Sequence, residues 1–314
     1  MKKVLLSGIK PTGDMHIGNY FGAIKQFVDM QDSFESYVFV ADLHALTTVK
    51  ESSELRKQIF NITATYLACG LDPKKVVLFK QSTIGGELCE LTWMFNCLTT
   101  MPYLERAHAY KDAVANGKEA TVGLFDYPIL MAADILMQDP DVVPVGNDQK
   151  QHVEIARDTA QKFNNLWGEN FKMPEALILD STGIVPGIDG RKMSKSYGNT
   201  IPLFATDEEI DKAVMSIVTD SSGDVPTNVY AIHKLFKTEA ELAPIYEANK
   251  GKYKILKEAL AEDVKVFIRP LREKYNEIQS HPEIVEETLR RGGEIVTARA
   301  KAKMSAVKNA VGLL

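Results

Sequence analysis

Short apolar segments alternate with helix-like segments through the first two-thirds of the chain. The segments that read as strands are Val4–Gly8, Tyr37–Leu43, Val76–Gln81 and Val142–Gly146. Strands that are apolar throughout are typical of a parallel sheet with helices on both of its faces. The sequence therefore predicts an α/β fold, and it places bound ligands beyond the carboxyl ends of the strands.

The last third of the chain has a different pattern. From Asp207 onward no segment reads as a strand. Apolar residues from Leu256 to Ile278 recur at steps of 4, 4, 3, 4, 4 and 3, which predicts an amphipathic helix that Pro270 kinks or divides. A second helix is expected over 282–311. The boundary between the two parts is expected near residue 200.

The composition is that of an ordinary globular protein, with 45% hydrophobic and 25% charged residues over 314 positions. No apolar run is long enough to span a bilayer and no signal peptide is recognisable, so the expected location is the cytoplasm. The spacing of Cys69, Cys89 and Cys97 suits neither a zinc site nor a disulfide framework, so we expect buried thiols. No metal site is predicted.

The net charge of −5 argues against a nucleic-acid partner for the chain as a whole. The end of the chain, from residue 290 onward, nevertheless has basic side chains opposed only by Glu294. These are Arg290, Arg291, Arg299, Lys301, Lys303 and Lys308. They predict a local basic face on an acidic protein.

A glycine-containing loop over 8–13 leaves the first strand and leads into His16-Ile17-Gly18-Asn19 at a helix start. Glycine lets a ligand approach the backbone closely, and a helix N-terminus attracts anions. Neither the dinucleotide fingerprint nor the P-loop fingerprint is present. His16 and Asn19 are candidates for neutral hydrogen bonds to phosphate oxygens or to adenine. The alternative is a tight turn with a solvated histidine.

The loop over 189–196 contains Arg191, Lys192 and Lys195 between small hydroxyl side chains. Phosphate transfer needs positive charge where negative charge develops on the leaving group. Lysines on a mobile loop can close over a bound nucleotide and act most strongly in the transition state. The alternative is a solvated basic loop, but the glycine-containing loop upstream favours the functional interpretation.

The segment 125–136 predicts a helix whose first turn contains Pro128. Tyr127, Met131 and Asp134 are spaced by 4 and 3 residues and therefore share one face. Asp134 lies among alanines and aliphatic residues, which predicts a carboxylate that faces an apolar pocket and needs a donor. The alternative is a carboxylate that caps a helix or pairs with a neighbouring arginine. After the strand that ends at Gly146, Asp148 is either an N-cap or a ligand contact.

Two of these segments, HIGN at 16–19 and KMSKS at 192–196, resemble the signature pair of class I aminoacyl-tRNA synthetases. HIGNY at 16–20, YPILMAADIL at 127–136 and VPVGNDQKQH at 143–152 resemble the bacterial-type tryptophanyl-tRNA synthetases. The resemblance covers essentially the whole chain. It implies a Rossmann-like parallel-sheet nucleotide-binding domain at 1–200, with a dimer-forming helical insertion at about 101–140, and an α-helical anticodon-binding domain at 201–314.

The resemblance also implies a reaction and its partners. L-tryptophan is activated by ATP to tryptophanyl-adenylate and then transferred to the 3′ end of tRNA(Trp), with release of AMP and diphosphate. Both nucleophiles come from the substrates, and Mg²⁺ bridges the ATP phosphates. The implied assembly is a cytoplasmic homodimer.

The implied site residues fall into three groups. The catalytic group is Lys192, Lys195, His16 and Asn19. The ATP contacts are Lys10, Pro11, Thr12, Gly18, Asn19, Gly146, Asn147, Asp148, Val185, Lys192, Met193, Ser194, Lys195 and Ser196. The tryptophan contacts are Asp134, as acceptor of the indole N–H, with Tyr127, Met131, Gln149, His44, Val143 and Val145.

Some positions depart from the family pattern. Lys10 replaces the usual glutamine, Asn147 replaces the usual glutamate, and Ile-Asp-Gly-Arg precedes the lysine loop. Leu6 and Leu43 differ from the common choices around the pocket. Three alternatives remain: a tyrosyl-tRNA synthetase, a small-molecule adenylyltransferase, and a catalytically silent tRNA-binding paralogue, in which both motifs should be broken.

Overall fold

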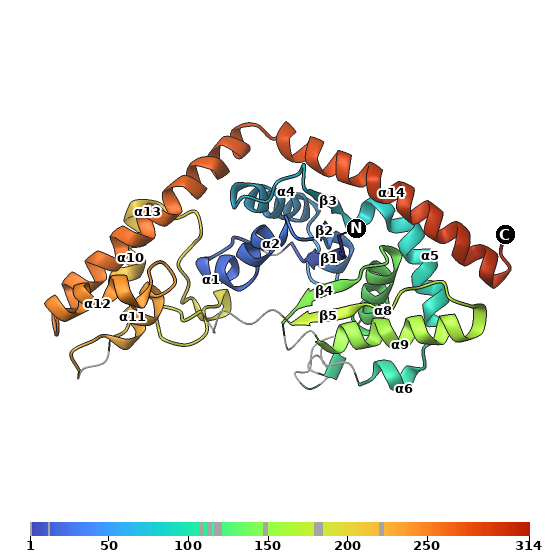
Figure 1. The fold of residues 1–314 in the computed structure, drawn as a ribbon, viewed down its shortest axis with the longest axis horizontal. Helices are drawn as coiled ribbons and strands as arrows, with labels where there is room; N and C mark the ends of the chain where they lie inside the picture. The colour runs from blue at the N-terminus through green and yellow to red at the C-terminus, as the bar shows by residue number, and fades with distance from the viewer. Residues whose placement is uncertain are drawn as a thin grey trace.

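The structure is a computed structural model that describes residues 2–11, 13–106, 110–111, 115, 121–146, 150–178, 185–219 and 223–314. Its centre is a parallel sheet with the strand order β3-β2-β1-β4-β5 (Figure 1). The strands are β1 (Val4–Ile9), β2 (Glu35–Val40), β3 (Val76–Lys80), β4 (Val142–Val145) and β5 (Glu175–Ile178). The predicted α/β fold is confirmed.

The sequence analysis missed β5 and extended β2 too far. β5 is an edge strand whose residues are only partly buried or exposed, so it lacks the solid apolar run of the inner strands. β2 ends at Val40 because the chain turns into the short helix α3 (Asp42–Ala45). Both differences lie at the boundaries and edge of the sheet.

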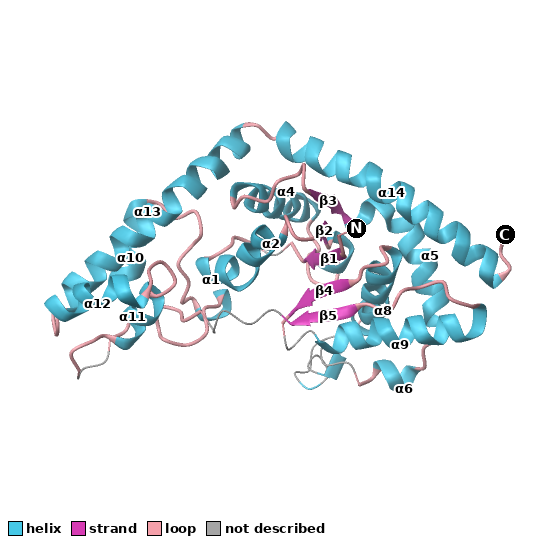
Figure 2. Ribbon diagram, in the orientation of Figure 1, coloured by secondary structure: helices cyan, strands magenta, loops and turns pink. Residues whose placement is uncertain are grey.

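Helices separate and follow these strands, as Figure 2 shows in cyan. The helices of the sheet-forming part are α1 (Ile17–Asn19), α2 (Lys25–Met30), α3, α4 (Ser52–Ala68), α5 (Gly85–Asn96), α6 (Met101–Leu104), α8 (Val122–Met137) and α9 (Lys150–Trp167). The later helices are α10 (Asp207–Met215), α11 (Thr227–His233), α12 (Glu239–Ala248), α13 (Tyr253–Ser280) and α14 (Glu283–Val311). A π-helical turn η1 (Tyr20–Ile24) joins α1 to α2, and two 3₁₀ turns are η2 (Gln81–Ile84) and η4 (Lys195–Tyr197).

Alternate residues of β2 enter two separate hydrophobic cores. Val38 and Val40 pack with residues of α2, α4 and α13. Tyr37 and Phe39 pack with residues of α5, α8, α9 and α14. Successive strand side chains point to opposite faces, so both faces of the sheet are covered, as predicted.

The two central strands β1 and β4 are paired at a single position. Their register joins Leu5 to Val142, whereas β1 pairs with β2 along its whole length. Pro144 in β4 has no N–H to donate to a neighbouring strand. The sheet therefore opens toward its carboxyl edge between β1 and β4. The strand order reverses at this point, which is where open α/β sheets bind ligands.

The helix α13 runs unbroken through Pro270, so the expected division into two helices is wrong, whereas the alternative of a kink stays a prediction. The missing N–H leaves the carbonyl group one turn earlier without a helical partner. That position, Val266, is 66% exposed, so the interrupted turn lies on the solvent side of the helix.

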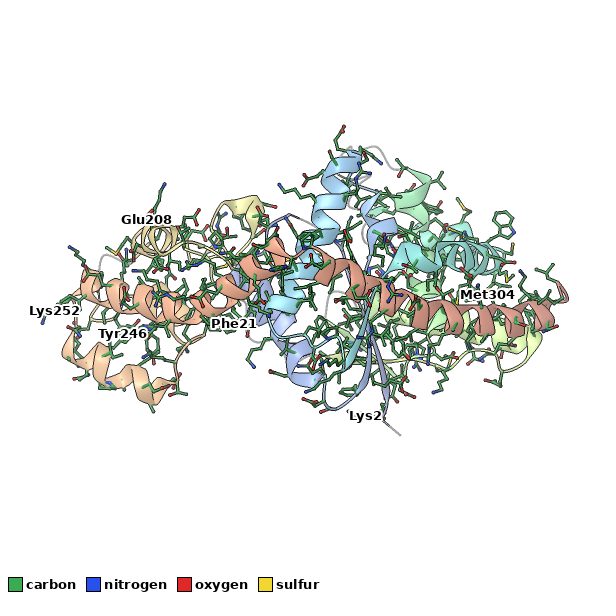
Figure 3. All side chains as sticks on the ribbon, turned by 90° about the horizontal axis from the view of Figure 1, so that it is seen from above. Lys2, Phe21, Glu208, Tyr246, Lys252 and Met304 are labelled. Carbon is green, nitrogen blue, oxygen red and sulfur yellow. The ribbon has the colours of Figure 1, made fainter. Side chains whose placement is uncertain are left out.

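The helix α14 lies along the sheet-forming part of the molecule. Figure 1 shows it passing over β3 and α5, while α10 to α12 cluster beneath α13. In Figure 3, which looks down on these two long helices, Lys252 before α13 and Met304 of α14 lie toward opposite ends of the molecule. How the segment 201–314 divides into functional units stays a prediction.

The expected basic face at the end of the chain is present only in part: Arg290, Arg291 and Lys301 are exposed, whereas Arg299, Lys303 and Lys308 fasten α14 to the sheet-forming part. Arg299 donates to the carbonyl oxygen of Gln138 at 2.7 Å. Lys303 donates to the carbonyl oxygen of Asn170 at 2.8 Å and pairs with Asp139. Lys308 pairs with Glu90 of α5 at 2.9 Å. Arg290, in contrast, pairs with Glu287 and Glu294 of α14 itself.

One surface of α5 and α8 is exposed and apolar. Trp93 is 70% exposed, and Val122 is 81% exposed. Cys89 and Cys97 are also exposed, so the expectation of buried thiols holds only for Cys69. We call Cys89, Trp93, Val122, Gly123 and Leu130 the α5–α8 face, which contains a groove of about 320 Å³. None of the helices in the described part of the chain combines the length and apolar character that a membrane span requires.

Candidate active site

A cavity of about 560 Å³ lies where β1 and β4 separate. Its floor is formed by β1 from Leu6 to Ile9 and by β4 from Val143 to Val145. Its walls come from η1, α3 and α8. The predicted site residues that line it are Lys10, Gly146, His44, Tyr127, Met131, Val143 and Val145.

The residues expected around tryptophan form the apolar side of this cavity. Tyr127 and Met131 lie one turn apart on α8, as their spacing predicts. The Tyr127 hydroxyl is 3.2 Å from His152 Nε2, which orients the ring. The helix begins at Val122 with Thr121 as its N-cap, so Pro128 lies inside the helix and not in its first turn.

Asp134 lies behind the cavity and not on its lining surface. Its side chain is 3% exposed. His44 Nε2 approaches Oδ2 at 2.9 Å, and the Gln81 amide nitrogen approaches Oδ1 at 2.9 Å and Oδ2 at 2.8 Å. Burial raises the pKa of Asp134, while the hydrogen bonds from His44 and Gln81 act to lower it. The prediction that this acid needs a donor is confirmed, and within the described part of the chain the donors are His44 and Gln81, not a helix end or an arginine.

The HIGN motif begins α1 and is held against the segment after the lysine loop. The Ile17 N–H donates to the Ile201 carbonyl at 3.0 Å, and the Leu203 N–H donates to the Met15 carbonyl at 2.9 Å. Asn19 Oδ1 accepts the N–H of His16 at 3.0 Å. These contacts fix the helix start on the same side of the molecule as the lysine loop.

His16 is a buried and neutral histidine, not a solvated one. It is 7% exposed, and Nδ1 has no hydrogen-bond partner among the described residues. Burial, with a further contribution from the positive charge of Lys195, lowers its pKa to about 4. His16 therefore offers uncharged imidazole nitrogens at neutral pH, as the sequence analysis expected.

The lysine loop is a compact turn tied to Asn199. Asn199 Oδ1 accepts the Ser194 N–H at 2.8 Å, and its amide nitrogen donates to the Lys192 carbonyl at 3.1 Å. The Met193 N–H donates to the Val185 carbonyl at 2.8 Å, and the Met193 side chain is buried. Gly18 lets this side chain come close, since an added Cβ would stand 3.3 Å from Met193 Cβ. The loop thus packs on the HIGN helix.

The structure brings Lys195 to the loop that follows β1. A Cβ added to Gly13 would stand 2.9 Å from the Lys195 ammonium nitrogen. Gly13 has a φ of +41°, so its backbone also suits glycine. On the cavity side, Lys10 donates to the Thr47 hydroxyl at 3.1 Å. Burial lowers the pKa of Lys10 and of Lys195.

Four predicted contacts lie outside the described residues: Thr12, Asn147, Asp148 and Gln149. Pro11 is buried beside Lys10, whereas Lys192 and Ser196 are exposed on the lysine loop. The described residues contain no cluster of histidine, cysteine and acidic side chains that could hold a metal ion.

The sequence analysis missed two residues that organise the site, Gln81 and Asn199. Gln81 is fully buried, and Asn199 is 1% exposed. Their signal in the sequence is weak, because a single amide side chain at the end of a strand or after a glycine occurs in many loops. Only the fold shows that each amide joins segments that are distant in the chain.

Comparison with known proteins agrees with this geometry. Residues 2–283 match the family model described as tRNA synthetases class I (W and Y). The chain belongs to this family. A tryptophan–tRNA ligase of Fusobacterium nucleatum is 46% identical over 98% of this chain and 98% of its own length.

Solved structures of this family resemble the fold closely. The tryptophanyl-tRNA synthetase of Campylobacter jejuni, complexed with ADP and tryptophan, has a TM-score of 0.92 and 43% identity over 99% of this chain and 100% of its own. The enzyme of Mycoplasma pneumoniae has a TM-score of 0.85 and 31% identity, over 100% of this chain and 99% of its own. The expected membership in the tryptophanyl branch is confirmed, and the tyrosyl alternative is not favoured.

Proposed function

We propose that this tryptophan–tRNA ligase forms tryptophanyl-adenylate from L-tryptophan and ATP in the cavity between β1 and β4. The tryptophanyl group is then transferred to the 3′ end of tRNA(Trp), with AMP as the second product. The main support for the proposal is that three features lie together at the carboxyl edge of the sheet. These are an apolar cavity backed by Asp134, the buried neutral His16, and the Lys195 amine over the loop after β1.

For tryptophan, the apolar wall formed by Tyr127, Met131, Val143 and Val145 receives the indole ring, with Gln149 as a further contact. Asp134, which lies directly behind the cavity lining and beside His44, is the proposed acceptor of the indole N–H. Phenylalanine would leave this buried acceptor without a donor, which disfavours its binding. Tyrosine has a donor of its own, so the depth of the pocket must exclude it.

For ATP, the expected contacts surround the loop after β1. Lys192 and Lys195 stabilise the negative charge that develops on leaving diphosphate, and His16 and Asn19 offer neutral hydrogen bonds. The remaining proposed contacts are Lys10, Pro11, Thr12, Gly18, Gly146, Asn147, Asp148, Val185, Met193, Ser194 and Ser196. The tryptophan carboxylate attacks the α-phosphate, so the protein needs to position the two substrates and supply no nucleophile of its own.

Mg²⁺ would be held by the phosphate oxygens of ATP. The described residues offer no cluster of carboxylates for a resident metal, and a cation that bridges phosphates does not require one. When bound, the ion neutralises part of the phosphate charge. The Lys195 amine approaches the same region from the protein side.

The helical segment from residue 201 to 314 is proposed to read the anticodon, and the location is proposed to be the cytoplasm. The three cysteines are free thiols, which suits a reducing compartment. The structure ties the helical segment to the ATP side through ring contacts. Phe21 of η1 stacks on Phe267 of α13 with ring centroids 5.4 Å apart.

We also propose a homodimer that forms through the α5–α8 face. An exposed tryptophan such as Trp93, beside a mainly apolar groove, is unusual on a monomer and marks an interface. Met101, at the start of the proposed dimer-forming insertion, is 61% exposed as well. Tyr127 lines both this groove and the substrate cavity, so the interface would reach the tryptophan site.

The test is ATP–diphosphate exchange by the purified protein with tryptophan, tyrosine or phenylalanine and without tRNA. We expect exchange with tryptophan alone. Exchange with tyrosine would move the chain to the sister branch. Absence of exchange combined with tRNA binding would identify a silent paralogue, which the intact motifs argue against.

A further inference from the structure

Gln81 is the buried centre of a hydrogen-bond network behind the cavity. It lies directly after β3, as the first residue of η2, and it is completely shielded from solvent. Its amide nitrogen donates to both oxygens of Asp134, at 2.9 and 2.8 Å. Its amide oxygen accepts the N–H of Leu43 at 3.1 Å and that of His44 at 3.4 Å.

These contacts fix the orientation of the amide. The carboxylate of Asp134 accepts and the two backbone N–H groups donate, so a flipped amide would place like groups together at both ends. Gln81 therefore connects α8, which contains Asp134, to the first turn of α3, which contains His44. The neighbouring Ser82 N–H donates to Asp42 of the same turn at 2.9 Å, which holds α3 and η2 together.

Among the described residues, this network leaves one acceptor position of the Asp134 carboxylate unused. Oδ2 accepts from both His44 and Gln81, whereas Oδ1 accepts from Gln81 alone. A carboxylate oxygen has two lone pairs, so Oδ1 retains one for a further donor. Gln81 restrains both oxygens at once, and it thereby sets the rotation of the carboxylate about its Cβ–Cγ bond.

We propose that Gln81 is a positioning residue for tryptophan specificity, which presents Oδ1 of Asp134 to the indole N–H and fixes His44 at the cavity wall. This inference rests on the proposed role of Asp134 in binding tryptophan. Gln81 does not line the cavity and does not touch the substrate. It acts through Asp134 and through the backbone of α3.

A neutral donor suits this position better than a charged one. Asp134 is surrounded by His44 and Gln81 as donors and by the carboxylate of Asp42, which raises its pKa further. An arginine or lysine in place of Gln81 would compete with the indole N–H as a strong ion-pair partner. The glutamine amide stabilises the ionised carboxylate and leaves its charge available to the ligand.

The experiment compares Gln81→Met, Asp134→Asn and the double variant in ATP–diphosphate exchange at varied tryptophan and ATP concentrations. We expect Gln81→Met to raise KM for tryptophan by about 10- to 100-fold, the effect of losing hydrogen bonds to a charged group. KM for ATP should change little. The double variant should equal Asp134→Asn alone, because Gln81 acts through that carboxylate.

A second readout is the pH profile of kcat/KM for tryptophan. Removing the amide donor raises the pKa of Asp134, so the acidic limb of the profile should move to higher pH in Gln81→Met. A loss of stability alone would not move this limb.

Gln138→Met is the matched control. Gln138, the residue that follows α8, is also buried, and its side-chain amide has no partner among the described residues. This variant should keep the wild-type KM for tryptophan.

The outcomes separate the two proposals. If Asp134→Asn impairs tryptophan binding and Gln81→Met does not, the role of Gln81 is overturned. The role of Gln81 is also overturned if the increase in KM for tryptophan in the double variant equals the product of the increases in the two single variants. If Asp134→Asn keeps the wild-type KM for tryptophan, the proposed role of Asp134 in binding tryptophan is contradicted, independently of the result for Gln81→Met.

Discussion

Gly292 of α14 lies directly against the carbonyl oxygen of Leu78 in the edge strand β3. A Cβ added to Gly292 would stand 1.9 Å from that oxygen and 2.7 Å from the carbonyl carbon. The helix therefore covers an edge that would otherwise be open to pairing with another chain. Only glycine permits this close approach of a helix to a strand backbone.

Gly292→Ala is expected to lower the free energy of unfolding by at least about 2 kcal/mol, since the obstacle is backbone that cannot rotate away. Urea unfolding at neutral pH measures the change. Gly86→Ala on α5 is the control, because no atom lies within 4 Å of the added Cβ. That variant should be neutral or slightly stabilising. Equal effects of the two substitutions would contradict the close contact.

Lys195→Ala is expected to reduce the rate of adenylate formation by about 10²–10³-fold, as for removal of one transition-state donor. KM for tryptophan should change little, because the lysine approaches the ATP side. Single-turnover adenylate formation followed by rapid quench measures the rate. Lys254→Ala, which removes an exposed lysine of α13, serves as the control. An unchanged rate in Lys195→Ala would exclude the loop from the mechanism.

Lys303→Met should destabilise the protein by about 1–3 kcal/mol, because it leaves the buried part of Asp139 without its cation. The Lys303 side chain is only 14% exposed. Lys301→Met, two residues earlier on the exposed side of α14, should change stability by less than about 0.5 kcal/mol. Chemical denaturation of both variants measures the free energy of unfolding, and it decides whether Lys303 fastens α14 to the sheet-forming part. If Lys303→Met were as neutral as its control, that role would be wrong.

Trp93→Arg should convert the proposed dimer to monomers at micromolar concentration. A buried tryptophan at the centre of an interface contributes about 2 kcal/mol or more, and a buried unpaired charge adds a further cost. Light scattering coupled to size-exclusion chromatography measures the mass. Val266→Arg replaces an exposed apolar residue of α13 and should leave the mass unchanged. A dimer that survives Trp93→Arg would place the interface elsewhere.

His16 should make stability depend on pH in a defined window. Its folded pKa is about 4, below the ordinary value of 6.5, so the unfolded state binds more protons between these values. Stability is therefore fully present above about pH 6.5 and falls as the pH approaches 4.

Between pH 7.5 and 5 the wild type should lose up to about 2 kcal/mol more than His16→Asn, less any screening by solvent. Urea unfolding of both proteins at the two pH values measures the difference. Parallel losses would show that His16 is not held neutral by the fold.

The fold was predictable where the residues form long apolar or strictly periodic segments. The inner strands and the stripe of α13 belong to this class, and the structure shows them within a few residues of the expected bounds. β5 was missed because its burial is partial. The division of the helix at Pro270 was wrongly expected, because the turn that loses a hydrogen bond lies on the solvent side, where the loss costs less free energy.

The site was predictable to the extent that its residues belong to contiguous motifs. His16 and Lys195 were found in this way, and the fold brings them together. Gln81 could not be found, because its function depends on Asp134, fifty-three positions away in the chain. Arg299, Lys303 and Lys308 of α14 were misjudged for a related reason. The sequence shows that a side chain is charged. It does not show whether that side chain faces solvent or donates to a backbone carbonyl group of a neighbouring element.

Because β1 and β4 pair at a single position, we expect the substrates to contribute to the stability of the sheet. In a parallel sheet half of the peptide groups of β1 point away from β2, and beyond Leu5 those groups meet the cavity instead of a strand. We expect a ligand in this cavity to lie between the two halves of the sheet and to offer hydrogen-bond partners to the peptide groups of β1 that lack a neighbouring strand. The gap in the sheet and the proposed substrate site are therefore the same place, and we expect bound substrates to stabilise the sheet there.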